Sequence, residues 1–295
     1  MADEQKNYKD TVFRMIFKDK ENLLSLYNAV NGTNHQNPEE LEITTLENAL
    51  YMNMKNDVSC MMDFFLDLYE HQSTVNPNIP LRDLFYVSKI LQGLTVNDDL
   101  YSSRKIYIPL PRFYMFYNGL KEMPEQWEMK LSESCIWPEN GEKAPMLELT
   151  VKAFNINFGK NKKLLDTCQK LKEYAQYVDR IRKCAREIPL KEAIERAIEE
   201  CIRERILSDF LRKNRAEALE MSWYEYNEEL HLKNERQIAY EEGLEFGVRQ
   251  GMERGLEQGD IKYILRMHKN GYPLNQIAEI AAKTLEEVQA VIDKA

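Results

Sequence analysis

Residues 55–73, KNDVSCMMDFFLDLYEHQS, carry the pattern that decides the fold. Two short apolar runs flank Asp63 and Phe64, and their branched and aromatic side chains favour strands over helices. A hairpin with these two residues at its tip places Asp57 directly opposite Glu70. The stretch therefore predicts two paired strands with two acids facing each other near their open end.

The hairpin face that carries Asp57 and Glu70 also carries Gln72, because side chains alternate along a strand. Directly opposed residues have Cβ atoms about 4.5–5.5 Å apart, and like charges there destabilise the pair. A divalent cation between the carboxylates would remove this repulsion, since hard cations bind carboxylate oxygens. The spacing leaves one alternative open, in which one carboxylate simply points to solvent at the end of the hairpin.

The composition is that of an ordinary globular protein, with 43% hydrophobic and 30% charged residues in a chain of 295. The N-terminus is charged and lacks the apolar segment of a secretory signal. No run approaches the 18 apolar residues of a membrane span, so no membrane partner is expected. The five cysteines are scattered without CxxC spacing. We therefore expect reduced thiols, no zinc site and a cytoplasmic location.

The charge is unevenly distributed. The whole chain carries a net charge of −9, yet residues 152–186 hold ten Lys and Arg against three acids. A basic block on an acidic chain is typical of a localised contact with a polyanion such as DNA. An amphipathic helix with a solvated basic face explains the same block equally well.

Periodicity predicts helices and strands on both sides of the hairpin. Helical spacing over residues 8–31 indicates one or two helices, broken near Lys18 and ending at Gly32. A further helix is expected over residues 81–93, with Leu84, Phe85, Val87, Ser88 and Leu91 as its apolar positions. Further strands are expected over residues 42–50, 112–117, 127–135 and 148–156. This order predicts an α/β protein with a mixed sheet.

From residue 161 onward the pattern is helical, with continuous helices expected over residues 164–187, 190–214 and 215–242. Glycine then recurs at every fourth position from Gly243 to Gly259. Each glycine costs a helix about 0.8–1 kcal/mol relative to alanine. The repeat is therefore either a flexible linker or a helix that packs closely against a partner helix.

The last segment, residues 260–295, has the spacing of three short helices and resembles a helix-turn-helix unit. Its final helix opens with Glu286 and Glu287, where a DNA reader would carry basic or amide side chains. We therefore expect self-association or a regulatory partner through residues 243–295 rather than DNA binding by this segment.

The order of these motifs resembles the recombination-promoting nuclease (Rpn)/putative transposase group of the PD-(D/E)xK nuclease superfamily. The resemblance covers nearly the whole chain. It rests on the phrases KNDVSCMMD, LYEHQSTVNPNIPLR, FYMFYNG, LELTVKAFNINFGKN, AIERAIEECI, ILSDFL and AYEEGLEFG. It implies a restriction-endonuclease-like central mixed sheet flanked by helices and followed by an all-helical C-terminal half.

The resemblance also implies a catalytic site and a cofactor. The catalytic positions are Asp57, Glu70 and Gln72, with Asp57 and Glu70 as ligands of Mg²⁺, for which Mn²⁺ is an expected substitute. Gln72 stands where many superfamily members have lysine, and it cannot supply positive charge. Asp10 and Arg82 are accessory candidates, the first as an additional acid or a helix cap and the second as a phosphate contact.

The expected function is Mg²⁺-dependent DNA cleavage with little sequence preference, linked to recombination, mobile elements or defence. The alternative is a catalytically silent protein of the same fold that binds DNA or a partner. The expected organisation is a nuclease-like core over residues 1–160 and a helical extension over 161–242. A glycine-repeat helix or linker over 243–259 and a trihelical tail over 260–295 follow.

Overall fold

The computed structural model describes residues 11–45, 57–138 and 144–293. The chain divides into two compact units, residues 1–229 and 230–295. Within the described ranges, no helix is both long and apolar enough to cross a membrane.

The first unit begins with two helices, α1 (Val12–Phe17) and α2 (Lys20–Asn31). Asp19 caps α2, because its Oδ1 accepts the Asn22 N–H at 3.0 Å. The helix ends at Gly32, whose φ of 66° is favourable for glycine and provides a left-handed cap. The predicted break near Lys18 and the predicted end at Gly32 are both confirmed.

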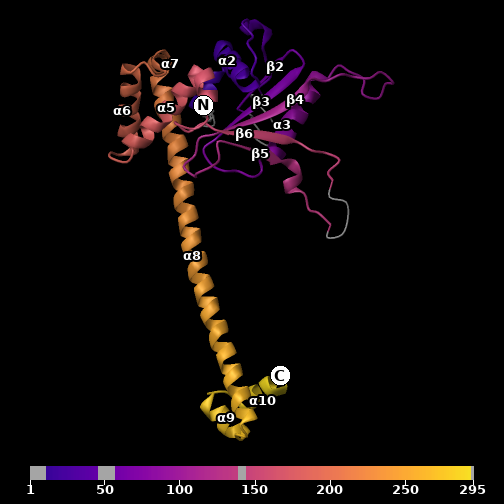
Figure 1. Cartoon of the computed structure of the whole chain (residues 1–295), viewed down its shortest axis with the longest axis vertical. Helices are drawn as coiled ribbons and strands as arrows, with labels where there is room; N and C mark the ends of the chain where they lie inside the picture. Colours follow the sequence, from indigo (N-terminus) through magenta and orange to yellow (C-terminus); the bar gives the residue numbers. More distant parts are fainter. Residues whose placement is uncertain (1–10, 46–56, 139–143, 294–295) are drawn as a thin grey trace, which may run out of the picture. The chain divides into compact units, whose positions relative to one another are not determined.

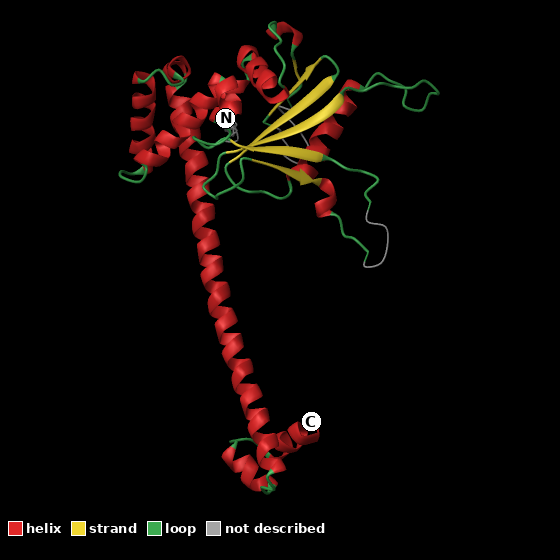
Figure 2. Cartoon of the chain, viewed as in Figure 1, coloured by secondary structure: helices red, strands yellow, loops and turns green. Residues whose placement is uncertain are grey.

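A six-stranded mixed sheet forms the centre of this unit, in the order β1-β2-β3-β4-β6-β5 (Figure 2). Strands β3, β4 and β6 run parallel, whereas the other neighbours are antiparallel. The strands are β1 (Glu42–Ile43), β2 (Val58–Met62), β3 (Phe65–Gln72), β4 (Leu110–Tyr117), β5 (Gln126–Lys130) and β6 (Thr150–Asn155). The α/β class with a mixed sheet is confirmed. Most of the strand expected over residues 42–50 lies outside the described residues.

The hairpin between β2 and β3 has the predicted register. Val58 pairs with Tyr69 and Met62 with Phe65. Asp63 at the tip has a φ of 53°, a left-handed conformation that aspartate tolerates better than most residues. Extending the same register by one residue places Asp57 opposite Glu70.

Different helices cover the two faces of the sheet (Figure 1). Helix α3 (Ile79–Leu94) packs on one face, where Tyr86 and Val87 join a buried cluster with Leu66 and Leu68. The opposite face carries the largest core, which contains residues from α1, α2 and the helices after β6.

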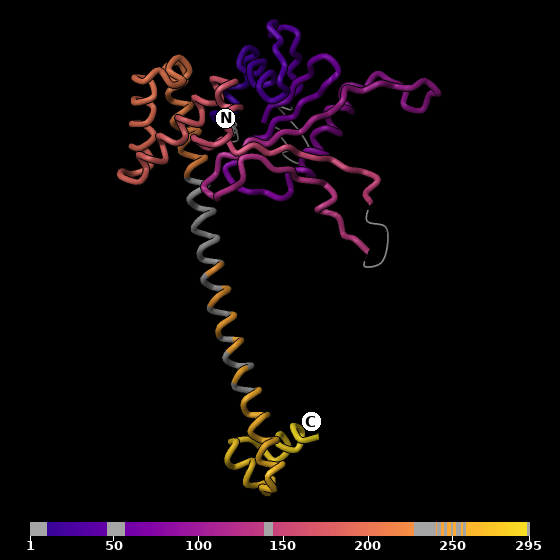
Figure 3. The backbone as a smooth tube through the Cα atoms, viewed as in Figure 1, coloured from indigo at the N-terminus to yellow at the C-terminus, as the bar shows by residue number. Residues whose placement is uncertain are grey.

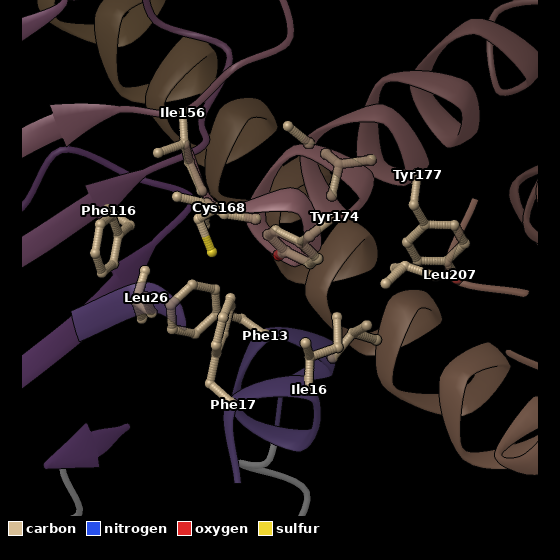
Figure 4. Packing of buried hydrophobic residues seen from close by; sticks show 14 of the residues in the cluster. Phe13, Ile16, Phe17, Leu26, Phe116, Ile156, Cys168, Tyr174, Tyr177 and Leu207 are labelled. Atoms are coloured by element: carbon tan, nitrogen blue, oxygen red, sulfur yellow. The ribbon is translucent and has the colours of Figure 1, made fainter. Parts of the chain in front are cut away.

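Several aromatic rings pack together in this larger core (Figure 4). The Phe13 ring lies 5.5 Å from that of Phe116 on β4 and 5.7 Å from that of Tyr174, between ring centroids. All three side chains are fully buried. The helical residues 164–226 of the first unit therefore share one core with the sheet.

Two breaks interrupt the helices that periodicity predicts as continuous over residues 164–187 and 190–214. Cys168 is fully buried and adopts an extended conformation. Leu207 has a φ of 48°, and its N–H donates to Glu173 Oε2 at 3.1 Å. Burial of Leu207 together with this hydrogen bond stabilises a conformation that periodicity does not reveal. The resulting helices are α4 (Lys162–Thr167), α5 (Gln169–Cys184), α6 (Leu190–Arg203) and α7 (Ser208–Lys213).

Helix α8 (Arg215–Lys269) passes from the first unit into the second and contains the whole glycine repeat. Two short helices follow it, α9 (Leu274–Ile280) and α10 (Leu285–Asp293) (Figure 3). Ile264, Ile277 and Val288 form their shared core. The tail thus consists of the end of α8 and two further helices, and the glycine repeat is helical.

Glu287 serves the fold of this tail. Its Oε2 accepts the Thr284 N–H at 2.8 Å, while the Glu287 N–H donates to Thr284 Oγ1 at 3.2 Å. This reciprocal arrangement is a capping box, which satisfies two otherwise unpaired donors at the start of α10. An acid at this position is therefore explained by helix capping.

Replacing Gly251 with alanine is expected to stabilise α8 by about 1 kcal/mol. Alanine has a higher helix propensity than glycine, and a Cβ added at Gly251 meets no atom within 4 Å. Thermal unfolding of the full chain, followed by calorimetry together with sedimentation velocity, checks this expectation. A lower melting temperature accompanied by loss of a dimer would instead indicate that the glycines pack against a partner helix.

Candidate functional site

Asp57 and Glu70 lie side by side at the open end of the β2–β3 hairpin. The Asp57 N–H donates to Glu70 Oε1 at 3.3 Å, and the His71 N–H donates to Asp57 Oδ2 at 2.7 Å. These bonds hold both carboxylates against the backbone of the opposite strand. The predicted juxtaposition of the two acids is confirmed.

Glu70 is almost completely buried, with 1% of its surface exposed. Burial raises its pKa well above the usual value, and the nearby charges of Asp57 and Asp83 raise it further. Arg82 opposes this shift, because its Nη2 donates to Glu70 Oε2 at 3.0 Å. The carboxyl group is thus placed in an environment where an added cation would be strongly favourable.

Arg82 lies on the first turn of α3 and reaches back to the hairpin. Its guanidinium also donates to the Tyr86 hydroxyl, from Nε at 3.3 Å and from Nη2 at 3.2 Å. About a third of its side chain remains exposed. Arg82 therefore brings to Glu70 a positive charge that Gln72 cannot supply.

Gln72 ends β3 and is partly buried. Its carbonyl accepts the Asn118 N–H at 2.9 Å, which fixes the backbone beside β4. Alternation along β3 places its side chain on the same face as Glu70. The other accessory candidate, Asp10, lies outside the described residues.

His71 points to the face opposite Glu70 and packs in the core. Its ring stacks on Phe13 with centroids 5.0 Å apart, and its Nε2 lies 3.0 Å from the Tyr174 hydroxyl. Burial, with a smaller effect of Arg182, lowers the pKa of His71 to about 3. A neutral, enclosed imidazole on this face has no role as a general base at the two acids.

Asp83 is a residue that the sequence analysis missed. It is fully buried on α3, and neither carboxylate oxygen has a hydrogen-bond partner among the described residues. Burial is the main cause that raises its pKa to about 8, and the charge of Asp57 adds to the effect whereas Arg82 opposes it. A buried carboxylate without partners is costly and requires an explanation.

The spacing of the buried residues along α3 could have indicated Asp83. The buried face of α3 is formed by Ile79, Asp83, Tyr86, Val87 and Ile90. The expected face was partly right: Val87 is buried, and Leu84 and Leu91 pack against buried clusters. Its other two members, Phe85 and Ser88, are exposed. Apolar residues alone do not identify the buried face of α3, because one residue of that face, Asp83, is an acid.

A cavity of about 370 Å³ opens beside Asp57. Two cationic side chains from α1, Arg14 and Lys18, line it together with Thr45. Arg14 is 6% exposed, so its charge is held largely inside the protein. The cavity therefore combines one carboxylate with two cations, an arrangement suited to a phosphate group beside a metal ion.

A larger cleft of about 1310 Å³ lies on the side of the sheet that carries α2 and α4. Lys152 and Lys163 line it, and Tyr114 and Phe154 contribute aromatic rings. These two lysines belong to the basic block that the sequence analysis singled out.

The rest of that block is largely occupied by ion pairs along α5. Lys170 pairs with Glu173 at 3.2 Å, and Lys172 pairs with Asp166 at 2.7 Å. Arg180 bridges to both Glu200 and Glu204, and Lys183 pairs with Asp179. The α5 part of the block therefore resembles a solvated, neutralised helix face more than a phosphate-binding surface.

Comparison with known proteins gives no further assignment: no family model, no curated protein and no solved structure matches the chain. The chemistry of the site is consequently the basis on which its function can be argued.

Proposed function

We propose that the chain is a Mg²⁺-dependent DNA endonuclease with a PD-(D/E)xK fold, which cleaves phosphodiester bonds with little sequence preference. The observation that carries the proposal is the pairing of Asp57 with Glu70 across the hairpin, with Arg82 bonded to Glu70. A role in recombination, mobile elements or defence is part of the same proposal.

The residues present fit a hard divalent cation. Mg²⁺ typically uses one or two protein carboxylates and fills its remaining positions with water and phosphate. Among the described residues, each oxygen of Glu70 takes part in one hydrogen bond, to the Asp57 N–H or to Arg82. Since a carboxylate offers about four lone-pair sites, acceptor capacity for an ion remains. Mn²⁺ prefers the same oxygen ligands and is the expected substitute.

Each side chain then has a distinct role. Asp57 and Glu70 hold the metal, which supplies polarisation of the scissile phosphate and a lowered pKa for a bound water. Gln72 orients the attacking water through its amide. Arg82 supplies the fixed positive charge that stabilises the phosphate in the transition state.

The substrate backbone is held by cations outside the carboxylate pair. Arg14 and Lys18, which line the cavity beside Asp57, would contact the cleaved phosphate. Lys152 and Lys163 contribute a second contact surface at the larger cleft. Such contacts to phosphate carry no sequence information, in keeping with a nonspecific nuclease.

One observation favours a second candidate, a catalytically silent protein of the same fold that binds DNA or a partner. Within the described residues, no three carboxylate, imidazole or thiolate side chains are grouped so that they could hold a metal ion. Calorimetric titration with Mg²⁺ and Mn²⁺ separates the two candidates. Only the nuclease should bind either ion in a manner that depends on Asp57.

Incubating the purified chain with supercoiled plasmid tests the proposed function. Nicking is expected with Mg²⁺ or Mn²⁺ and is expected to disappear with EDTA. Ca²⁺ binds carboxylates with a looser geometry, so it is expected to permit DNA binding with little cleavage. Cleavage that persists unchanged in EDTA would contradict a metal-dependent mechanism.

A further inference from the structure

Asp83 and Glu70 approach the same point from two different elements. On β3, Glu70 follows Leu66 and Leu68 on the face covered by α3. On α3, Asp83 occupies the buried stripe between Ile79 and Tyr86. Both acids are therefore enclosed between the helix and the sheet.

The surroundings of this point are apolar on both sides. Ile79 belongs to a buried cluster that contains Met115, the residue paired with Glu70 in the β3–β4 register. Tyr86 belongs to the neighbouring cluster with Leu68. Asp83 thus lies where two apolar clusters meet, and a leucine would suit this position if packing alone decided it.

The nearby cation does not satisfy Asp83. Arg82 precedes it in the chain, but the Arg82 guanidinium donates to Glu70 and Tyr86. Both Asp83 oxygens lack a hydrogen-bond partner within the described part of the chain. A fully buried acceptor group without partners, close enough to two other carboxylates to interact with their charges, indicates a missing donor.

We propose that Asp83 is a positioning residue for a metal ion held by Asp57 and Glu70. The Asp83 carboxylate accepts hydrogen bonds from water molecules in the hydration shell of that ion. This inference rests on the proposed function, because it requires that ion. Asp83 is not a direct ligand of the ion in this proposal. Among the described residues, no three Asp, Glu, His or Cys side chains are grouped closely enough to share an ion. Mg²⁺ retains several of its waters in proteins, and these waters supply the donors that Asp83 lacks.

The proposal predicts opposite changes with and without metal when Asp83 is replaced by asparagine. In EDTA, Asp83→Asn is expected to raise the melting temperature, because it removes a buried carboxylate without partners. With Mg²⁺ or Mn²⁺, the metal-induced rise in melting temperature should shrink. Affinity measured by calorimetric titration should fall by about 10- to 100-fold, the usual effect of losing an outer-shell partner.

Two further variants make the result decisive. Asp83→Leu fills the same apolar position and should behave in the same way as the asparagine variant. Asp98→Asn removes an exposed carboxylate in the loop after α3 and should change neither quantity. A purely structural Asp83 would give a lower melting temperature in EDTA and an unchanged metal affinity, and this outcome would overturn the inference.

The same measurements distinguish a failure of the inference from a failure of the proposed function. If the unaltered chain shows no Mg²⁺ or Mn²⁺ binding, the proposed function fails and the inference fails with it. If metal binding depends on Asp57 and Glu70 but remains unchanged in both Asp83 variants, only the inference is overturned.

Discussion

Replacing Glu70 with glutamine is expected to reduce plasmid nicking by about 10²- to 10³-fold, comparable to the loss of a dominant electrostatic group at an active site. Asp57→Asn is expected to have a similar effect. Each substitution keeps the shape of the side chain but removes a charge that the proposed metal ion requires. Nicking rates measured at saturating Mg²⁺, together with calorimetric Mg²⁺ affinity, check both expectations.

The controls separate loss of the site from loss of the fold. Glu122→Gln and Asp98→Asn remove exposed carboxylates elsewhere on the first unit and should leave nicking unchanged. Far-ultraviolet circular dichroism should be the same for all four variants. Full activity in either site variant, with the fold intact, would show that the two opposed acids do not hold the catalytic metal.

The hairpin could be predicted from the sequence because its information is local. Two strands and a two-residue tip determine the register, and the register places Asp57 opposite Glu70 without any knowledge of the remaining chain. The same alternation places His71 on the face opposite Glu70, and the structure shows that it stacks there on Phe13. Short-range alternation was sufficient for these residues.

The positions of Arg82 and Asp83 relative to the hairpin depend on how α3 packs against the sheet. A charged residue in a helical pattern normally indicates the solvent-exposed face. The pattern therefore predicted that Asp83 lies outside the buried face of α3. The structure shows the reverse, with Asp83 fully buried and Phe85 partly exposed. An acid inside an otherwise apolar stripe was the signal available beforehand, since such residues are rarely buried without a partner.

Ion pairs with acids distant in the sequence explain why the basic block, residues 152–186, is not mainly a phosphate-binding surface. Composition counts the charges of residues 152–186 alone, whereas Arg180 is bonded to Glu200 and Glu204 on and after α6. Antiparallel packing of helices brings these acids to the basic face. A local excess of positive charge is therefore a weaker predictor of DNA contact than the folded surface.

A second polar network lies on the opposite face of the sheet and has a structural role. Asp67 on β3 is fully buried and accepts hydrogen bonds from Arg112 Nε at 2.6 Å, Asn31 Nδ2 at 2.8 Å and the Tyr69 hydroxyl at 2.9 Å. Arg112 in turn donates to the Tyr27 hydroxyl at 3.1 Å. The network therefore ties the end of α2 to strands β3 and β4.

Asp67→Ala is expected to destabilise the chain by about 3–5 kcal/mol, because it leaves Arg112 without its buried partner. Urea unfolding followed by circular dichroism measures the change. The combined variant Asp67→Leu with Arg112→Met should recover much of the loss, since it removes both charges and fills the space with apolar groups. Asp166→Ala breaks an exposed pair with Lys172 and should change stability by less than about 1 kcal/mol. A loss at Asp67 no greater than that at Asp166 would show that the buried network contributes little to holding α2 on the sheet.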